Sequence, residues 1–152
     1  MGLITKSELD MNVISELRRK TPDPSVIEWF SKRPASTLYL SVLTLGELRK
    51  GIESVKDLER RMALTDWLET DLPVFFTGRI LPIDVKVTDR WGRLLAAAGR
   101  PLPAIDSLLG ATAAHYDLSV VTRNSRDFDN LGLTIINPWT AHSPDADTED
   151  VG

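Results

Sequence analysis

The 152-residue sequence contains no cysteine and only two histidines, His115 and His142. Without cysteine, the chain can form neither a disulfide bond nor a thiolate zinc site. The two histidines are too few and too far apart in the sequence for a histidine-based metal centre. A metal ion, if the protein uses one, is therefore bound by oxygen atoms, which favours a hard cation such as Mg2+.

The sequence also lacks a long apolar run and an excess of basic residues. No run approaches the roughly 20 apolar residues that a helix needs to cross a bilayer. The N-terminal segment MGLITKSEL lacks the basic and apolar stretches of a secretory signal. We therefore expect a cytoplasmic protein with no membrane contact. The net charge of -4 argues against avid, non-specific nucleic-acid binding but is compatible with a nuclease.

The length and the hydrophobic content of 42% predict one globular domain over residues 1–139, followed by a disordered acidic tail over residues 140–152. Short β-like runs alternate with helical patterns, which is typical of an α/β fold. Strands are predicted up to residue 10 and over residues 37–42, 79–84, 118–122 and 133–139, the last at a sheet edge. Helices are predicted over residues 13–19, from residue 24, within 45–70, and over 85–99 and 103–114.

Four acidic residues lie beside the ends of predicted strands or the starts of predicted helices: Asp10, Glu47, Asp106 and Asp127. In an α/β fold such positions gather at the carboxyl edge of the sheet, where sites form. Gly110 lies one turn after Asp106, so this helix start can approach its neighbours closely. Four clustered carboxylates repel one another, which raises their pKa values and lowers stability unless a divalent cation neutralises them. The joint pattern predicts a metal site.

Each acid could also serve a purely structural purpose. Thr44 and Glu47 fit a capping box, in which Glu47 bonds back to the backbone at the start of its helix. Asp106 lies in the first turn of its helix, where a negative charge is favourable. Asp10 and Asp127 are suited to cap the turns that follow them. For any one acid, capping accounts for the residue at least as well as a metal site does, and only the joint pattern favours the metal.

Four segments in this order, LDMNVISEL, LSVLTLGELRKGI, PAIDSLLGATAAHYDLSVVTRNSRDF and INPW, resemble the PIN domain of the VapC and FitB-like toxins of type II toxin-antitoxin systems. The resemblance covers residues 9–139. It implies a parallel sheet flanked by helices, endoribonuclease activity with Mg2+ or Mn2+, and neutralisation by a cognate antitoxin through which DNA is contacted only indirectly. The resemblance also implies a homodimer. We expect three apolar residues to be exposed at such an interface: Trp29, Phe30 and Trp67.

The resemblance further implies roles for individual residues. The catalytic acids are Asp10, Glu47, Asp106 and Asp127, with Asn124 as the alternative in the fourth place. Asp10, Asp106 and Asp127 are the implied metal ligands, while Glu47 completes the shell or orients a water molecule. The auxiliary polar residues are Asn12, Thr122 and Asn124. Candidate contacts to RNA phosphates are Arg49, Arg123 and Arg126.

The chain departs from the family pattern at two places. Met11 stands where the family has a threonine, and the strand before Asp10 contains Lys6 and Glu8, whose burial in a parallel strand would be costly. We therefore expect one of three outcomes: this strand is short, it lies at a sheet edge, or the first residues are altered relative to a natural start. A second function stays open, that of a weakly catalytic or inactive PIN module in a DNA-bound antitoxin complex. A receiver-type phosphoacceptor domain is disfavoured, because VVTRN offers Arg123 where that class needs a lysine.

Overall fold

The computed structural model describes residues 5–140, so almost all of the predicted acidic tail lies outside the described residues. The centre of the fold is a parallel sheet in the order β3-β2-β1-β4-β5. Its strands are β1 (Ser7–Leu9), β2 (Leu38–Ser41), β3 (Ile80–Leu81), β4 (Ser119–Val121) and β5 (Ile135–Ile136). The prediction of an α/β fold with a parallel sheet and an edge strand near the end of the domain is confirmed.

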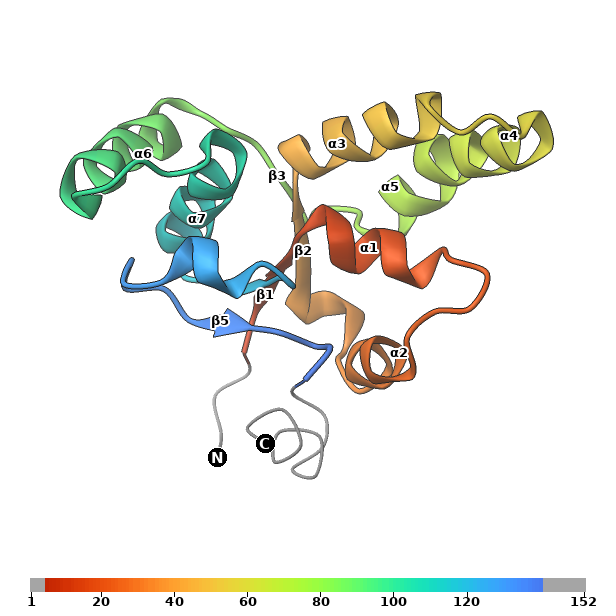
Figure 1. Ribbon diagram of the computed structural model, residues 1–152, viewed down its shortest axis with the longest axis horizontal. Coiled ribbons are helices and arrows are strands. Elements are labelled where there is room, and N and C mark those ends of the chain that lie inside the picture. Colours follow the sequence, from red (N-terminus) through yellow and green to blue (C-terminus); the bar gives the residue numbers. More distant parts are fainter. Residues whose placement is uncertain (1–4, 141–152) are drawn as a thin grey trace.

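Helices cover both faces of the sheet, which gives three layers (Figure 1). One group packs on the face that carries Leu9, Leu38 and Val121. It consists of α1 (Met11–Leu17), α2 (Pro24–Ser31), α3 (Val42–Glu53), α4 (Leu58–Asp66), the π-helical turn η2 (Trp67–Asp71) and α5 (Leu72–Phe75). The opposite face is covered by α6 (Val85–Ala98) and α7 (Ala104–Tyr116). Two 3-10 turns, η1 (Ala35–Thr37) and η3 (Ser125–Phe128), complete the described elements. None of the helices in residues 5–140 is long and apolar enough to span a membrane.

Polar side chains and prolines set several element boundaries. Asp23 accepts a hydrogen bond from the backbone N–H of Ser25 and caps α2, with Pro24 in the first helical position. Asp84 caps α6 in the same way through Val87. Strand β3 is shorter than predicted, because Pro82 has no N–H group to donate to the sheet.

The predicted capping box at Glu47 is wrong. Helix α3 begins three residues earlier than that box requires, and its cap is Ser41, whose Oγ accepts a hydrogen bond from the backbone N–H of Leu43 at 3.1 Å. Thr44 is therefore already inside the first turn, and Glu47 lies in the second. Since Glu47 has no capping role at this helix start, its carboxylate is free for another function.

Strand β1 is short, as predicted, but it does not lie at an edge. It pairs with β2 on one side and β4 on the other, so it is central. Lys6 precedes the strand and is exposed, whereas Glu8 is only 1% exposed. Glu8 stands in register with Tyr39 and Val120, and neither carboxylate oxygen has a hydrogen-bond partner within the described part of the chain. Burial, and next the charge of Asp10, raise the pKa of Glu8 well above its ordinary value.

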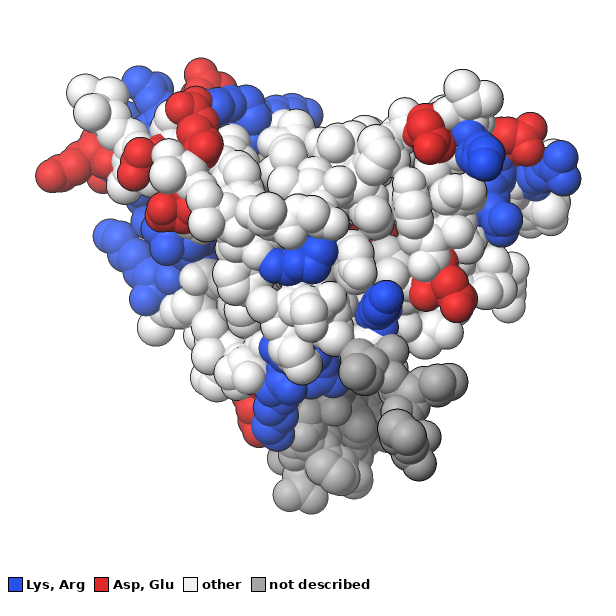
Figure 2. All heavy atoms as spheres, turned by 180° about the vertical axis from the view of Figure 1, so that it is seen from behind, with Lys and Arg blue, Asp and Glu red and all other residues white. Residues whose placement is uncertain are grey.

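The aromatic residues expected at an exposed surface are distributed differently. Trp29 is 3% exposed and belongs to the core against the helices of the first group, so the expectation of exposure is wrong for this residue. Phe30 and Trp67 are partly buried and pack against the same core. Seen from behind, both signs of charge occur on the two upper arms of the molecule, and the surface between the arms is largely uncharged (Figure 2).

Candidate metal centre

The four acids named from the sequence come together at the carboxyl edge of the sheet. Asp10 directly follows β1, and Glu47 lies in α3, the helix that follows β2. Asp106 is in the first turn of α7, and Asp127 is in η3, just after β4. A pocket of about 380 Å3 at this edge is lined by Asp10, Asn12, Glu47, Asp106 and Asn124, with Met11 and apolar residues at the start of α7.

Asp10 is held through both of its carboxylate oxygens. Oδ1 accepts a hydrogen bond from the backbone N–H of Val13 at 3.1 Å and so caps α1, while Oδ2 accepts one from the hydroxyl of Thr122 at 2.5 Å. The Thr122 hydroxyl oxygen in turn accepts a bond from the backbone N–H of Asn124 at 3.0 Å. Burial raises the pKa of Asp10, and hydrogen bonds from Thr122, Val13 and Asn12 partly offset that rise. Capping and a site role are therefore compatible at this residue.

Asp106 and Asp127 interact directly. Burial raises the pKa of Asp106 to about 7, helped by a hydrogen bond with Asp127 and by the negative charges of Asp127, Asp10 and Glu47. Near neutral pH, Asp106 is therefore poised between its protonated and charged forms. The pKa of Glu47 is raised by burial and by the charge of Asp10, and Lys50 partly offsets this. Each acid thus interacts with at least one other member of the set.

Gly110 allows this close approach between α7 and η3. A methyl group built on Gly110 would lie 3.0 Å from Cδ1 of Leu133 and 3.6 Å from the ring of Phe128. Phe128 is the last residue of η3, next to Asp127, and is 2% exposed. The missing side chain at Gly110 lets this segment rest on α7 one turn from Asp106, as the spacing in the sequence predicted.

None of the four acids forms an ion pair within the described residues, and only Glu47 is partly offset by a nearby cation, Lys50. The ion pairs there involve other carboxylates, those of Glu16, Glu28, Glu53, Glu69 and Asp89. In residues 5–140, no three histidine, aspartate or glutamate side chains converge tightly enough to form a finished metal cage. Mg2+ does not require such a cage, because it keeps several water ligands and often takes only one or two carboxylates. A group of unneutralised carboxylate oxygens therefore fits a hydrated divalent cation.

The three arginines expected to contact phosphates have different surroundings. Arg49 is paired with Glu69 at 2.5 Å and with Glu53 at 3.7 Å, on the side of α3 that faces η2. Arg123 lies over the ring of Trp139, with 4.9 Å between its guanidinium carbon and the ring centroid. Arg126 is exposed in η3, beside Asp127. Arg123 and Arg126 carry charges that no carboxylate pairs within the described chain.

Sequence patterns did not indicate two features of this region. Met11 lines the acidic pocket and also a second cleft, which lies between α1, α3, α4 and η2. Its sulfur atom accepts a hydrogen bond from the hydroxyl of Ser15. Arg60 also reaches that cleft, from α4. No local pattern links Arg60 to the end of α1, because Arg60 contacts the backbone oxygen of Arg18 across 42 residues of sequence.

The chain is a three-layer α/β protein with a parallel sheet. Four interacting carboxylates lie at the carboxyl edge of that sheet, around an acidic pocket that favours cations. The sequence pattern of the family described as PIN domain matches residues 8–132. The chain belongs to this family.

Three proteins, one of them named as a ribonuclease, resemble the chain over most of its length. It is 38% identical over 136 residues to the plasmid stability protein StbB of Pseudomonas syringae pv. tomato, a match that covers 88% of this chain and 98% of that protein. It is 37% identical over 134 residues to a VapC ribonuclease of Sinorhizobium fredii, covering 86% and 96%. The crystal structure of FitAcB from Neisseria gonorrhoeae matches with a TM-score of 0.82 and 32% identity, covering 88% and 98%. The resemblance to VapC and FitB-like proteins is confirmed.

Proposed function

We propose that this protein is the cytoplasmic toxin of a toxin-antitoxin pair and that it hydrolyses RNA phosphodiester bonds with the help of Mg2+ or Mn2+. The observation that carries the proposal is the group of four interacting carboxylates, none of which forms an ion pair in residues 5–140. Such a group is unfavourable on its own and is stabilised by a divalent ion. The VapC ribonuclease and a tRNA(fMet)-specific endonuclease VapC of Shigella flexneri, 28% identical, support RNA as the substrate.

Asp10, Asp106 and Asp127 would hold the ion. When bound, it supplies positive charge to the scissile phosphate and lowers the pKa of a coordinated water molecule. Thr122 keeps the carboxylate of Asp10 in one orientation, and Asn124 fixes the Thr122 hydroxyl. The half-buried carboxylate of Glu47 completes the shell or orients the attacking water. The positive charge of a bound ion would favour the deprotonated form of Asp106, whose pKa of about 7 results from burial, a hydrogen bond with Asp127 and neighbouring negative charges.

We also propose a cognate antitoxin as the partner, with a homodimer as the toxin's own assembly. Solved relatives include DNA-bound VapBC from Salmonella typhimurium and a VapBC toxin-antitoxin system from Mycobacterium tuberculosis. By this likeness, DNA is contacted through the antitoxin. The C-terminal segment of the antitoxin covers the acidic pocket. There, an arginine can form bidentate hydrogen bonds with the carboxylates and replace the charge of the metal.

The decisive experiment replaces Asp106 by asparagine and compares it with Asp84→Asn. Both changes remove one carboxylate at a helix start, and asparagine keeps much of the capping ability of aspartate. Asp84 caps α6 and does not line the acidic pocket. We expect Asp106→Asn to abolish Mg2+-dependent cleavage of RNA and to weaken Mn2+ binding in calorimetry. Asp84→Asn should cut RNA at the wild-type rate.

Stability separates the site role from a capping role. Without metal, Asp106→Asn should be as stable as the wild type or more stable, because repulsion within the pocket is relieved. An Asp106→Asn protein that cuts RNA at the wild-type rate would contradict the assignment of Asp106 as a catalytic acid. A wild-type protein that binds its antitoxin but cuts no RNA in Mg2+ would favour the alternative of an inactive binding module.

A further inference from the structure

A second cleft, of about 270 Å3, adjoins the acidic pocket and shares Met11 and Glu47 with it. It lies between α1, α3, α4 and η2, and its remaining lining includes Arg18, Arg19, Arg60 and Trp67. Helix α1 connects the two hollows, because Asp10 caps its start and Arg18 caps its end. Eight residues of helix correspond to roughly 12 Å, so the basic end of the cleft lies a short distance from the acids.

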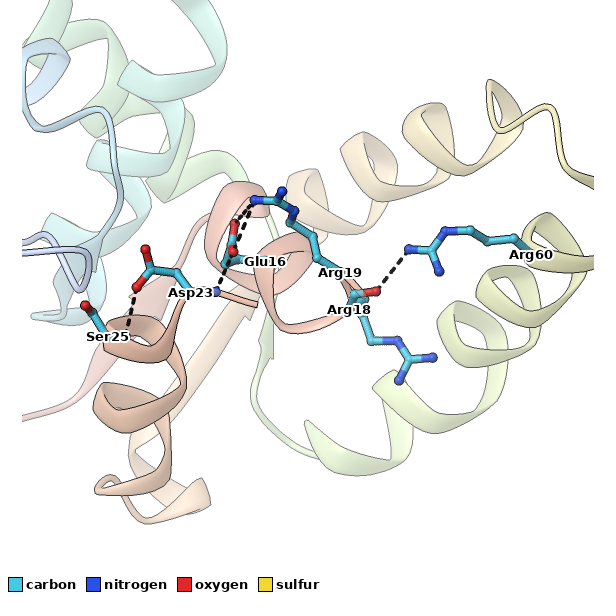
Figure 3. Close-up of polar contacts among 6 residues, drawn as sticks. All are labelled: Glu16, Arg18, Arg19, Asp23, Ser25 and Arg60. Atoms are coloured by element: carbon cyan, nitrogen blue, oxygen red, sulfur yellow. Dashed lines mark hydrogen bonds and ion pairs between the residues drawn. The ribbon is translucent and has the colours of Figure 1, made fainter. Parts of the chain in front are cut away.

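Neutral groups hold two of these arginines in position. Nη2 of Arg60 donates a hydrogen bond to the backbone oxygen of Arg18 at 3.0 Å, at the carboxyl end of α1 (Figure 3). The guanidinium carbon of Arg18 lies 5.3 Å from the centroid of the Trp67 ring. A carbonyl oxygen and an aromatic face orient a guanidinium group without cancelling its charge. Arg18 and Arg60 are therefore ordered cations whose charge is still available to a ligand.

The third arginine has an acidic partner. Arg19 pairs with Glu16 at 3.2 Å, and Glu16 also accepts a hydrogen bond from the backbone N–H of Asp23 at 2.8 Å (Figure 3). Glu16 is buried and holds the segment between α1 and α2 in place, while Arg19 stays largely exposed. One negative charge thus offsets one of the three positive charges, and the basic end of the cleft keeps a positive excess.

We propose that this cleft binds the single-stranded RNA that flanks the scissile bond, with a backbone phosphate on the guanidinium group of Arg18. This proposal rests on the function proposed above and names the path of its substrate. A planar guanidinium group matches the oxygens of a phosphate. The ring of Trp67 packs against the guanidinium group of Arg18, and Arg60 lines the cleft from α4. The strand then runs along α1 from Arg18, past Met11, to the acids.

Charge and position favour RNA over a protein segment in this cleft. Apolar residues also line the cleft, among them Leu48, Ile52 and Leu64. Arg18 and Arg60 form no ion pair within residues 5–140, so a phosphate would pair with them directly, whereas an apolar peptide would leave both charges without a partner. The cleft also shares Met11 and Glu47 with the pocket that Asp10 and Asp106 line, so a strand bound in the cleft lies next to the proposed catalytic acids. Unpaired RNA fits better than a duplex, because a single strand follows a narrow groove.

The test measures RNA binding in EDTA, so that cleavage is prevented. A short, fluorescently labelled, mixed-sequence single-stranded RNA is titrated with wild-type protein and with Arg18→Gln at several salt concentrations. We expect weaker binding by Arg18→Gln and a slope of log K against log salt that is shallower by about 0.7, the value for one lost phosphate contact on a single strand. Arg18→Lys should restore the slope, because it restores the charge.

Arg93→Gln is the matched control. Arg93 is also an exposed helical arginine, but it lies in α6 and pairs with Asp89. The Arg93→Gln protein should bind RNA with the wild-type slope of log K against log salt. All variants should have the wild-type melting temperature. An unchanged slope in Arg18→Gln, or wild-type protein with no salt-dependent RNA binding, would overturn the proposal. If Arg18→Gln instead weakened only antitoxin binding, the cleft would belong to the antitoxin. Cleavage by wild-type protein in Mg2+, and its loss in Asp106→Asn, report separately on the proposed function.

Discussion

The hydroxyl of Thr122 donates a hydrogen bond to Oδ2 of Asp10 at 2.5 Å, across 112 residues of sequence. The contact follows from the register of the sheet, in which Leu9 of β1 stands beside Val121 of β4. The residue after each strand end is then Asp10 in one case and Thr122 in the other. Neighbouring parallel strands thus orient the first acid of the site before any ligand arrives.

Replacing Thr122 by valine keeps the shape of the side chain and removes the donor. Because this hydrogen bond lowers the pKa of Asp10, we expect that pKa to rise further in Thr122→Val. The lost bond to a buried charged group should lower the free energy of unfolding by about 1.5–3 kcal/mol at neutral pH. Urea unfolding measures this, and RNA cleavage should fall with it. Thr122→Ser, which keeps a hydroxyl, should stay close to the wild type; equal losses in both variants would contradict the role of the hydroxyl.

Ser41 and Glu47 should separate stability from activity within one helix. Ser41 caps α3, so Ser41→Ala should lower the free energy of unfolding by about 1 kcal/mol and leave the chemistry of the pocket unchanged. Glu47→Gln removes a charge from the pocket but no cap, so it should reduce cleavage at nearly unchanged stability. Thermal melts and cleavage rates of both variants test this. Destabilisation by Glu47→Gln that matched Ser41→Ala would restore a capping role for Glu47.

The metal-free protein should lose stability as pH rises from about 4 to about 7. The pKa of Asp106 is about 7 in the folded state, and the pKa values of Asp10, Glu47 and Glu8 are also raised. The folded protein therefore holds more protons than the unfolded chain in this range, and stability is greatest below the unfolded pKa values. Urea unfolding in EDTA should show the decline, and saturating Mg2+ should reduce it. A stability that rose over this range without metal would contradict the electrostatic picture.

Glu8 should be replaceable by leucine with a gain in stability. Its carboxylate is buried in the central strand without a hydrogen-bond partner in the described residues, which is unfavourable for a charged or polar group. We expect Glu8→Leu to raise the free energy of unfolding by about 1–3 kcal/mol at neutral pH, as measured by urea unfolding. Glu59→Leu, at an exposed position in α4, is the control and should change little. A loss of stability in Glu8→Leu would mean that the carboxylate has a favourable role.

Much of the fold and of the acidic cluster followed from local patterns. Asp10 and Asp127 come after predicted strands, and parallel strands bring such positions to one edge of the sheet. The caps at Asp23 and Asp84 also follow a local pattern, because an aspartate directly before a helical pattern is typical of an N-cap. Gly110 was informative for a similar reason, since its spacing from Asp106 placed it on the same helix face.

Other features depend on tertiary packing and were not predictable in this way. Ser41 and Thr44 are both good capping residues three positions apart, and the choice between them depends on where β2 stops pairing with its neighbours. Glu8 contradicts the rule that charges avoid central strands, because the apolar residues around it hold β1 in the middle of the sheet. Arg60 meets the end of α1 only through the packing of α4, so its sequence neighbours carry no information about that contact.

Gly110 connects packing to the ionic state of the pocket. Alanine there would fit after a small movement of Leu133, whereas a branched side chain would push η3 away from α7. Asp127 would move with η3, and Asp106 would lose the neighbour that helps to raise its pKa to about 7. Burial and the charges of Asp10 and Glu47 would still raise the pKa of Asp106, but by less. Asp106 would then be protonated less often in the metal-free protein at neutral pH, and a bound cation would release less of that proton. A position with no side chain thus influences how strongly metal binding would acidify the surrounding solution.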